Sequence, residues 1–451
     1  MSSVGAKAAL AFLFIFVSSG IARAETMTLG QALALAYMSN PRLEQQRATL
    51  RATDEDVARA LSGWRPSLAV TGSYGYTSND IAAALLPIPN GHPRDVTVTV
   101  TQPLFNGSTI PQVRQAKASV AAGRAQLTSV EQSVLFGAAH AYVDVIGDEA
   151  GLRFRRENVA VLEEQLNTIQ ERVNIGDITR TDLTLVQSRL SAAKAEVAFA
   201  EAKLGASRAQ FARAVGQPAP TLDGSPASPG IPAREEQALG RAIADNPDLA
   251  AAREQARAAD AAVDVAAGAL LPSVSVQGQY KNSRDEIATG IRDSSLAVVA
   301  QLRVPLYQAG EEYANIRKAK EIRNAATFAI SDVERQVRQA LDIAWQAQSA
   351  AKDAMAFYEQ QVGAAEMAYE GFAEGLRAGE RTTFDLLNSA QEVLSARISL
   401  AEARRQFYVN SFELAVAMGG LTAKSLNLPV QFYDPQRHYD KDAGRWIGTG
   451  D

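Results

Sequence analysis

The chain has 451 residues, with 45 basic and 50 acidic side chains, three histidines and no cysteine. The lack of cysteine excludes disulfides, thiolate metal sites and cysteine nucleophiles, and a formal net charge of -5 gives no basic excess for binding nucleic acid. His92, His140 and His438 lie too far apart in sequence for a local metal motif. We therefore expect no enzyme activity and no catalytic, cofactor-binding or metal site.

Residues 1–24 have the pattern of a secretory signal peptide. Lys7 precedes an apolar run from Ala8 to Val17, and the segment ends in Ala22-Arg23-Ala24. The apolar run is too short to cross a bilayer as a helix, which favours a cleaved signal over an uncleaved anchor. The sequence predicts cleavage after Ala24 and export.

The rest of the sequence is duplicated. Asn40-Pro41-Arg42-Leu43 recurs as Asn246-Pro247-Asp248-Leu249, and Pro103-Leu104-Phe105 recurs as Pro305-Leu306-Tyr307. Many matches in the same order, with insertions between them, indicate an internal repeat. The expected division is a first repeat at 25–217, a linker rich in Pro, Gly and Ser at 218–232, a second repeat at 233–420 and an irregular tail at 421–451 that is either peripheral or mobile.

Each repeat contains two stretches of alternating residues. Leu68 and Val70 lie on one face of the first, and Val96, Val98 and Val100 alternate with threonines in the second. This period of two predicts strands near 67–76, 95–102, 273–281 and 294–302. Such strands suit a barrel with a lipid-facing side, although the edge of a soluble sandwich has the same pattern. Four strands cannot close a barrel, and lipid tolerates no open sheet edge, so a barrel would need several chains.

Very long helical segments follow the strands. The apolar spacing predicts helices over 108–175, 180–215, 310–377 and 382–418. The first of these would be about 100 Å long, which a compact domain cannot accommodate. The pattern indicates a coiled-coil or tubular assembly. The residues alone leave a second interpretation open: a periplasmic coiled-coil adaptor or structural protein without a membrane barrel.

Two stretches carry a family resemblance. They are Leu302-Arg303-Val304-Pro305-Leu306-Tyr307-Gln308-Ala309-Gly310 and Gly379-Glu380-Arg381-Thr382-Thr383-Phe384-Asp385-Leu386-Leu387-Asn388. With the duplicated order of strands and helices, the chain resembles the TolC family of outer-membrane efflux proteins. The resemblance implies a mainly α fold with a small β part, a trimeric α-helical barrel and a twelve-stranded β-barrel in the outer membrane of a Gram-negative cell.

The resemblance also implies a function and partners. A homotrimer of this kind docks on a periplasmic adaptor (a membrane fusion protein) and an inner-membrane transporter, sits in outer-membrane lipid, and exports drugs or secreted proteins, as in multidrug resistance or type I secretion. It needs no cofactor. The transporter selects the cargo, so the sequence of the channel does not identify it.

The resemblance places a gate at the end far from the strands. Gly176 and Gly379 would form the tip turns, and the gate residues would be Thr181, Asp182, Arg381, Asp385 and Asn388. In similar proteins an arginine at the Arg381 position links to the Thr-Asp pair of the first repeat, and three copies of Asp385 would form a carboxylate ring.

The alternative for these residues is a purely local role at helix starts, where Thr and Asp favour the helix dipole. Two positions depart from the family pattern. Asn388 stands where a second acid is expected, and Leu376 stands where a tyrosine is common.

Overall fold

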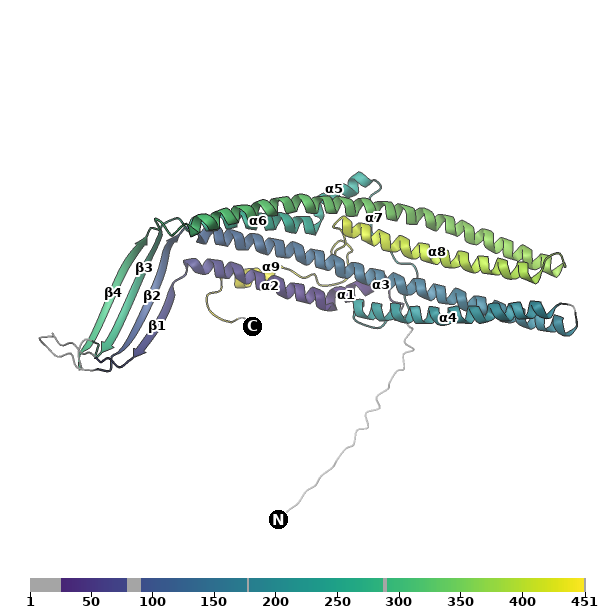
Figure 1. Ribbon diagram of the computed structural model, residues 1–451, viewed down its shortest axis with the longest axis horizontal. Coiled ribbons are helices and arrows are strands. Elements are labelled where there is room, and N and C mark those ends of the chain that lie inside the picture. Colours follow the sequence, from purple (N-terminus) through teal and green to yellow (C-terminus); the bar gives the residue numbers. More distant parts are fainter. Residues whose placement is uncertain (1–25, 79–90, 177, 287–289, 450–451) are drawn as a thin grey trace, which may run out of the picture.

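The chain is elongated in the computed structural model: a β-sheet forms one end, and paired long helices run from it to a tip at the other (Figure 1). The structure describes residues 26–78, 91–176, 178–286 and 290–449. The predicted signal peptide at 1–24 lies outside these residues.

The sheet is antiparallel throughout. Its strands follow one another in sequence order: β1 (Ser67–Tyr74), β2 (Arg94–Asn106), β3 (Ser273–Arg284) and β4 (Arg292–Arg303). The central pairing of β2 with β3 joins the two halves of the chain, and Val98 lies opposite both Val70 and Tyr280. The register of β2 on β3 shifts between Pro103 and Phe105, where the proline has no N–H for the ladder. The predicted mainly α fold with a small β part is confirmed, and β1 and β4 are the sheet edges.

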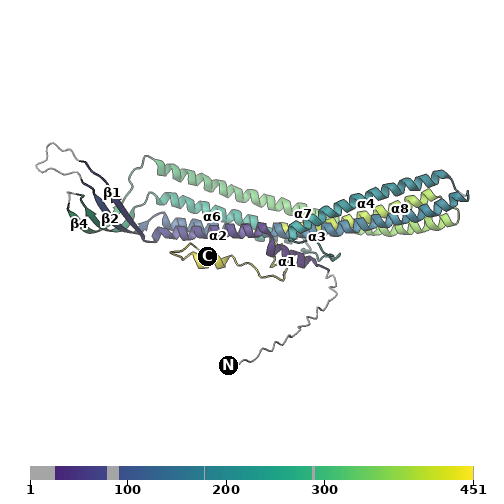
Figure 2. The same ribbon diagram turned by 90° about the horizontal axis from the view of Figure 1, so that it is seen from below.

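Four long helices build the body. They are α3 (Thr109–Asn174), α4 (Arg180–Val215), α7 (Glu311–Arg377) and α8 (Thr383–Ala417). With 66 residues, α3 is about 100 Å long. Its one proline, Pro111, is in the first turn, where the missing N–H breaks no helical hydrogen bond. Helices α3 and α4 pack as one antiparallel hairpin and α7 and α8 as another. The two hairpins run side by side to the tip in Figure 1 and overlap in the view turned by 90° (Figure 2). Among the described residues, no helix is both long and apolar enough to span a membrane.

Shorter helices flank the long ones on the side of the sheet. These are α1 (Leu29–Ser39), α2 (Pro41–Leu61) with a following 3-10 turn η1 (Ser62–Trp64), α5 (Glu235–Asp245) and α6 (Pro247–Gly268). Helix α2 packs on α3, and α6 packs on both α3 and α7.

The repeated Asn-Pro motif joins these short helices to the long ones. Asn40 Oδ1 accepts the N–H of Arg42 at 3.0 Å as the N-cap of α2, while its Nδ2 donates to the Ala214 carbonyl in the last turn of α4 at 3.3 Å. Asn246 caps α6 in the same way, and its Nδ2 donates to the Ala417 carbonyl in the last turn of α8 at 3.4 Å. Each asparagine therefore holds a helix start and the end of a distant helix together.

The main core lies where the short helices meet the middle of α3. Tyr142 is fully buried there, and its hydroxyl donates to the Met27 carbonyl at 2.8 Å and accepts the Asp223 N–H at 3.0 Å. Burial raises the pKa of Tyr142 to about 12, so the hydroxyl stays a neutral donor. The Tyr142 hydroxyl thus links the segment before α1, at Met27, and the segment after α4, at Asp223, to α3.

A buried ion pair joins the two repeats. Arg405 Nε on α8 lies 2.6 Å from Asp144 Oδ1 on α3, and His140 Nδ1 lies 3.0 Å from Asp144 Oδ2. Burial alone would raise the pKa of Asp144, but hydrogen bonds from His140 and Arg405 outweigh it and hold the pKa below its usual range. The carboxylate is therefore charged, and removing its partner would leave a buried charge unpaired.

The C-terminal segment corrects the expectation of an irregular, peripheral tail at 421–451. Leu421, Ala423 and Leu428 are buried in the main core, and the Ala423 N–H donates to Glu131 Oε1 on α3 at 2.7 Å. A short helix, α9 (Gln436–Asp442), then packs on α2. These apolar side chains reach the core from a backbone that is not helical. The sequence after Leu421 therefore has no helical periodicity.

Candidate functional site at the helical tip

The two predicted tip turns lie at the end of the molecule farthest from the sheet (Figure 1). Gly176 follows the C-cap of α3 with φ +81°, and Gly379 follows the C-cap of α7 with φ +80°. Positive φ suits glycine, which has no Cβ to clash with its own backbone. The N–H of Gly379 donates to the Leu376 carbonyl at 3.2 Å, so Leu376 closes this turn through its backbone.

Matching capping boxes begin the two return helices. The Thr382 hydroxyl donates to Asp385 Oδ2 at 2.7 Å and accepts the Asp385 N–H at 3.2 Å. Thr179 and Asp182 form the same arrangement, with a hydroxyl–carboxylate distance of 2.8 Å. The capping threonine of α4 is therefore Thr179, and Thr181 is an exposed residue of its first turn. Asp182 and Asp385 thus each complete a capping box, which stabilises the first turn of the helix.

Asp385 is charged at neutral pH. The hydrogen bond from the Thr382 backbone N–H, helped by the Thr382 hydroxyl and the nearby Arg381 guanidinium, lowers the pKa of Asp385 below its usual range. The helix start therefore fixes one carboxylate in position and keeps it ionised.

Arg381 is held in place by its own helical hairpin. Its guanidinium lies over the Phe372 ring, 4.9 Å from the centroid, and a Cβ added at Gly375 would come within 2.7 Å of Arg381 Cγ. The side chain therefore packs across the bare backbone of Gly375 at the end of α7. Within the described part of this single chain, it makes no hydrogen bond or ion pair with Thr181 or Asp182.

Asn388 has a partner that sequence reasoning missed. Arg189 Nη2 on α4 donates to Asn388 Oδ1 at 2.7 Å, and Nη1 donates to the Leu387 carbonyl at 3.3 Å. The Arg189 guanidinium also lies 5.6 Å from the Phe384 ring centroid. Leu387 itself enters an apolar cluster formed with Leu162, Ile169, Val186, Leu190 and Ala193 of the first hairpin. Arg189 and Leu387 therefore join the two hairpins near the tip.

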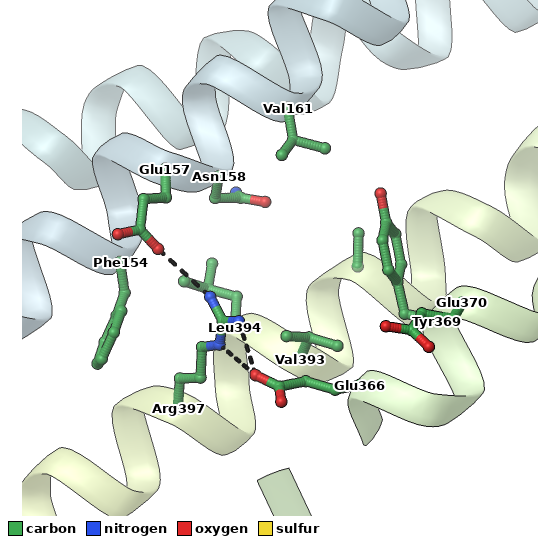
Figure 3. A pocket seen from close by; sticks show the side chains of 11 residues that line it. Phe154, Glu157, Asn158, Val161, Glu366, Tyr369, Glu370, Val393, Leu394 and Arg397 are labelled. Carbon is green, nitrogen blue, oxygen red and sulfur yellow. Dashed lines mark hydrogen bonds and ion pairs between the residues drawn. The ribbon is translucent and has the colours of Figure 1, made fainter. Parts of the chain in front are cut away.

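A second arginine crosses between the hairpins farther from the tip (Figure 3). Arg397 on α8 donates to Glu366 Oε1 on α7 at 2.6 Å through Nη2, and to Glu157 Oε2 on α3 at 3.3 Å through Nη1. Beside it lies a cavity of about 370 Å³ between α3, α7 and α8. Phe154 and Tyr369 contribute aromatic walls to this cavity.

The sequence does carry a trace of these links. When Gly176 is aligned with Gly379, Arg189 corresponds to Glu392 and Asn388 corresponds to Leu185. The link between Arg189 and Asn388 therefore falls at positions where the repeats differ, whereas Arg397 corresponds to Lys194, which is also basic.

Comparison with known proteins agrees with this architecture. The model of the family described as outer membrane efflux protein matches residues 32–217 and again 238–420. The chain belongs to the outer membrane efflux protein family. It is 32% identical to the outer membrane efflux protein BepC of Brucella suis over 93% of this chain and 91% of the relative. It is 25% identical to the alkaline protease secretion protein AprF of Pseudomonas aeruginosa over 74% of this chain and 71% of the relative.

A solved structure has the same fold. The open state of the MtrE outer membrane channel of Neisseria gonorrhoeae superposes with a TM-score of 0.76 at 19% identity, covering 88% of this chain and 90% of that one. Membership of the family makes this chain an exit channel of the outer membrane that reaches into the periplasm. The family consists of channel proteins rather than enzymes, which fits the expectation of no catalytic site.

Proposed function

We propose that three copies of this chain form one continuous export duct, in which each copy gives four strands to a twelve-stranded barrel and two helical hairpins to an α-helical tube. The observation that carries this proposal is the open sheet. Strands β1 and β4 are edges, and Leu68, Val70, Leu296 and Val298 on them are exposed in the single chain. Lipid leaves no such edge unpaired, so β1 of one chain must pair with β4 of the next.

The absence of native cysteine makes this pairing directly testable. We expect a cysteine at Leu68 or Val70, combined with one at Leu296 or Val298, to give disulfide-linked dimers and trimers in outer-membrane fractions. The matched control places the second cysteine at Tyr280, which lies opposite Leu296 but on β3, an interior strand that cannot reach a neighbouring β1. A series of β1–β4 pairs that gives monomers only would contradict the closed trimer.

We further propose that the duct works with an inner-membrane transporter and a periplasmic adaptor to export drugs or secreted proteins. The names of its relatives, one an efflux protein and one a protease secretion protein, support both cargo classes. Deleting the gene and comparing drug sensitivity with the profile of secreted proteins distinguishes them. Increased drug sensitivity alone indicates efflux, whereas loss of a secreted protein indicates secretion. A strain unchanged in both would contradict this role.

The gate is the third part of the proposal. Arg381 would pair with Thr181 and Asp182 of a neighbouring chain and hold the tip closed, while three copies of Asp385 would surround the opening as a ring of negative charge. The lowered pKa of Asp385 supports this, because the ring would be ionised under physiological conditions. Asn388 would contribute through Arg189 rather than as a second ring of charge.

The charge ring predicts an effect on selectivity. Three carboxylates at roughly 10 Å favour a cation by about 1 kcal/mol in water, which corresponds to roughly a fivefold higher local concentration. We expect Asp385→Asn to reduce the cation selectivity of purified channels, measured as the reversal potential in a salt gradient across a planar bilayer. Glu380→Gln is the control, because it removes an exposed carboxylate from the same tip but lies outside the proposed gate residues. An unchanged reversal potential for Asp385→Asn would exclude the ring.

A further inference from the structure

The C-terminal helix α9 is held on α2 by one histidine between two carboxylates. His438 Nδ1 lies 3.2 Å from Asp54 Oδ2 on α2, and His438 Nε2 lies 3.2 Å from Asp442 Oδ2 one turn along α9. Only 2% of the Asp54 side chain and 9% of the Asp442 side chain are exposed. Both ring nitrogens therefore face acceptors that have little access to water.

This arrangement gives the two nitrogens different roles. Asp54 Oδ1 is buried and makes no hydrogen bond within the described part of the chain, and the Asp54 carboxylate is compensated by His438 together with the nearby Arg124 guanidinium. An imidazole that donates Nδ1–H to a buried carboxylate is fixed in one orientation and presents the lone pair of Nε2 on its other side. Metal-binding histidines in proteins are oriented in this way.

Glu55 adds a third ligand atom, a carboxylate oxygen, beside those of His438 and Asp442. One carboxylate oxygen of Glu55, one of Asp442 and a ring nitrogen of His438 all lie within 4.8 Å of one another. Ligands at 2.0–2.1 Å around a tetrahedral zinc ion are separated by about 3.3 Å, close to the 3.2 Å between His438 Nε2 and Asp442 Oδ2. The other oxygen of Asp442 lies 3.1 Å from Arg445 Nη1, which leaves Oδ2 for the metal.

We propose that Glu55, His438 and Asp442 bind a divalent transition cation of the Zn²⁺ class, with Asp54 orienting the histidine. One imidazole and two carboxylates give a mixed nitrogen and oxygen set, which binds Zn²⁺ in preference to Mg²⁺ or Ca²⁺. Three protein ligands leave the fourth position to water. The ion joins α9 to α2 and so fixes the C-terminal segment to the first repeat, close to the sheet.

Zinc titration of the purified full-length protein by calorimetry tests this site, with excess Mg²⁺ present to occupy non-specific carboxylates. We expect one Zn²⁺ per chain, and binding about tenfold weaker or worse in both Glu55→Gln and Asp54→Asn. Glu55 is exposed and lies outside the ion pairs of His438, so Glu55→Gln leaves the His438 contacts with Asp54 and Asp442 in place. His140→Ala is the matched control, because His140 also pairs with a carboxylate but lies in no such three-ligand group among the described residues.

Limited proteolysis gives a second measurement. We expect Zn²⁺ to slow cleavage within residues 436–449 in the unmodified protein and to have no effect in Glu55→Gln. Absence of stoichiometric zinc binding, or equal affinity in Glu55→Gln and the unmodified protein, would overturn the proposal and leave His438 as an ion-pair partner only.

Discussion

Channels that carry Arg381→Ala are expected to conduct roughly tenfold more at rest than the unmodified protein. The expectation rests on the proposed contact between Arg381 and the Thr181-Asp182 pair of a neighbouring chain. A hydrogen bond to a charged group contributes about 1.5–3 kcal/mol, and losing that amount shifts the closed–open equilibrium by about a factor of ten or more. Arg381 is exposed and, within the described residues of its own chain, its side chain contacts Phe372 and Gly375, so we expect its removal to leave the fold intact.

Conductance of purified trimers in planar bilayers measures this effect. Arg377→Ala is the matched control, because it removes the same charge from the last turn of α7, near the same tip. A similar rise in both variants would mean that charge near the tip, rather than a specific latch, sets the conductance. Unchanged conductance in Arg381→Ala would exclude a latch at this residue.

The largest effect on stability is expected for Gly419→Ala. Gly419 follows the C-cap of α8 with φ +74°, and an added Cβ would clash with the Asp245 carbonyl oxygen and lie 2.8 Å from the Asn246 nitrogen. The Gly419 carbonyl also accepts from the buried Gln132 Nε2 at 2.7 Å, so this backbone cannot move away freely. Backbone strain and overpacking together should cost about 3 kcal/mol or more.

The apparent melting temperature followed by circular dichroism, at one fixed heating rate, measures this loss. Gly176→Ala is the control, since Gly176 has a similar φ of +81° but open space around it. It should cost only the strain of a positive φ, about 1 kcal/mol. If the two variants melt at the same temperature, the contact with Asp245 is not what fixes glycine at position 419.

Features that depend on short periodicity could be predicted from sequence. The alternation of Leu68 with Val70, and of Val96 with Val98 and Val100, placed β1 and β2 because a half-buried strand needs a period of two. The long helices were likewise expected because apolar spacing persists without an internal proline. Their observed ends lie within one residue of the expected ones, and α4 (Arg180–Val215) has the bounds expected from the sequence.

Contacts between distant parts of the chain could not be predicted. Arg189 and Asn388 are 199 residues apart, and Asp54 and His438 are 384 residues apart. Neither pair has a local motif, because each lies on separate helices that only tertiary packing brings together. Spacing along the chain does not reveal the proposed zinc ligands for the same reason, because Glu55 lies 383 residues before His438.

The two asparagine caps impose an order on folding. Asn40 bonds to Ala214 and Asn246 bonds to Ala417, so each repeat closes on itself through a contact that spans more than 170 residues. Neither repeat can complete its core until its last helix has been synthesised and exported. Leu421 and Leu428 are also buried in the main core, so that core can close only after nearly the whole chain has been synthesised. The exposed apolar side chains of β1 and β2 are made well before these contacts can form, so we expect the nascent chain to need protection from aggregation.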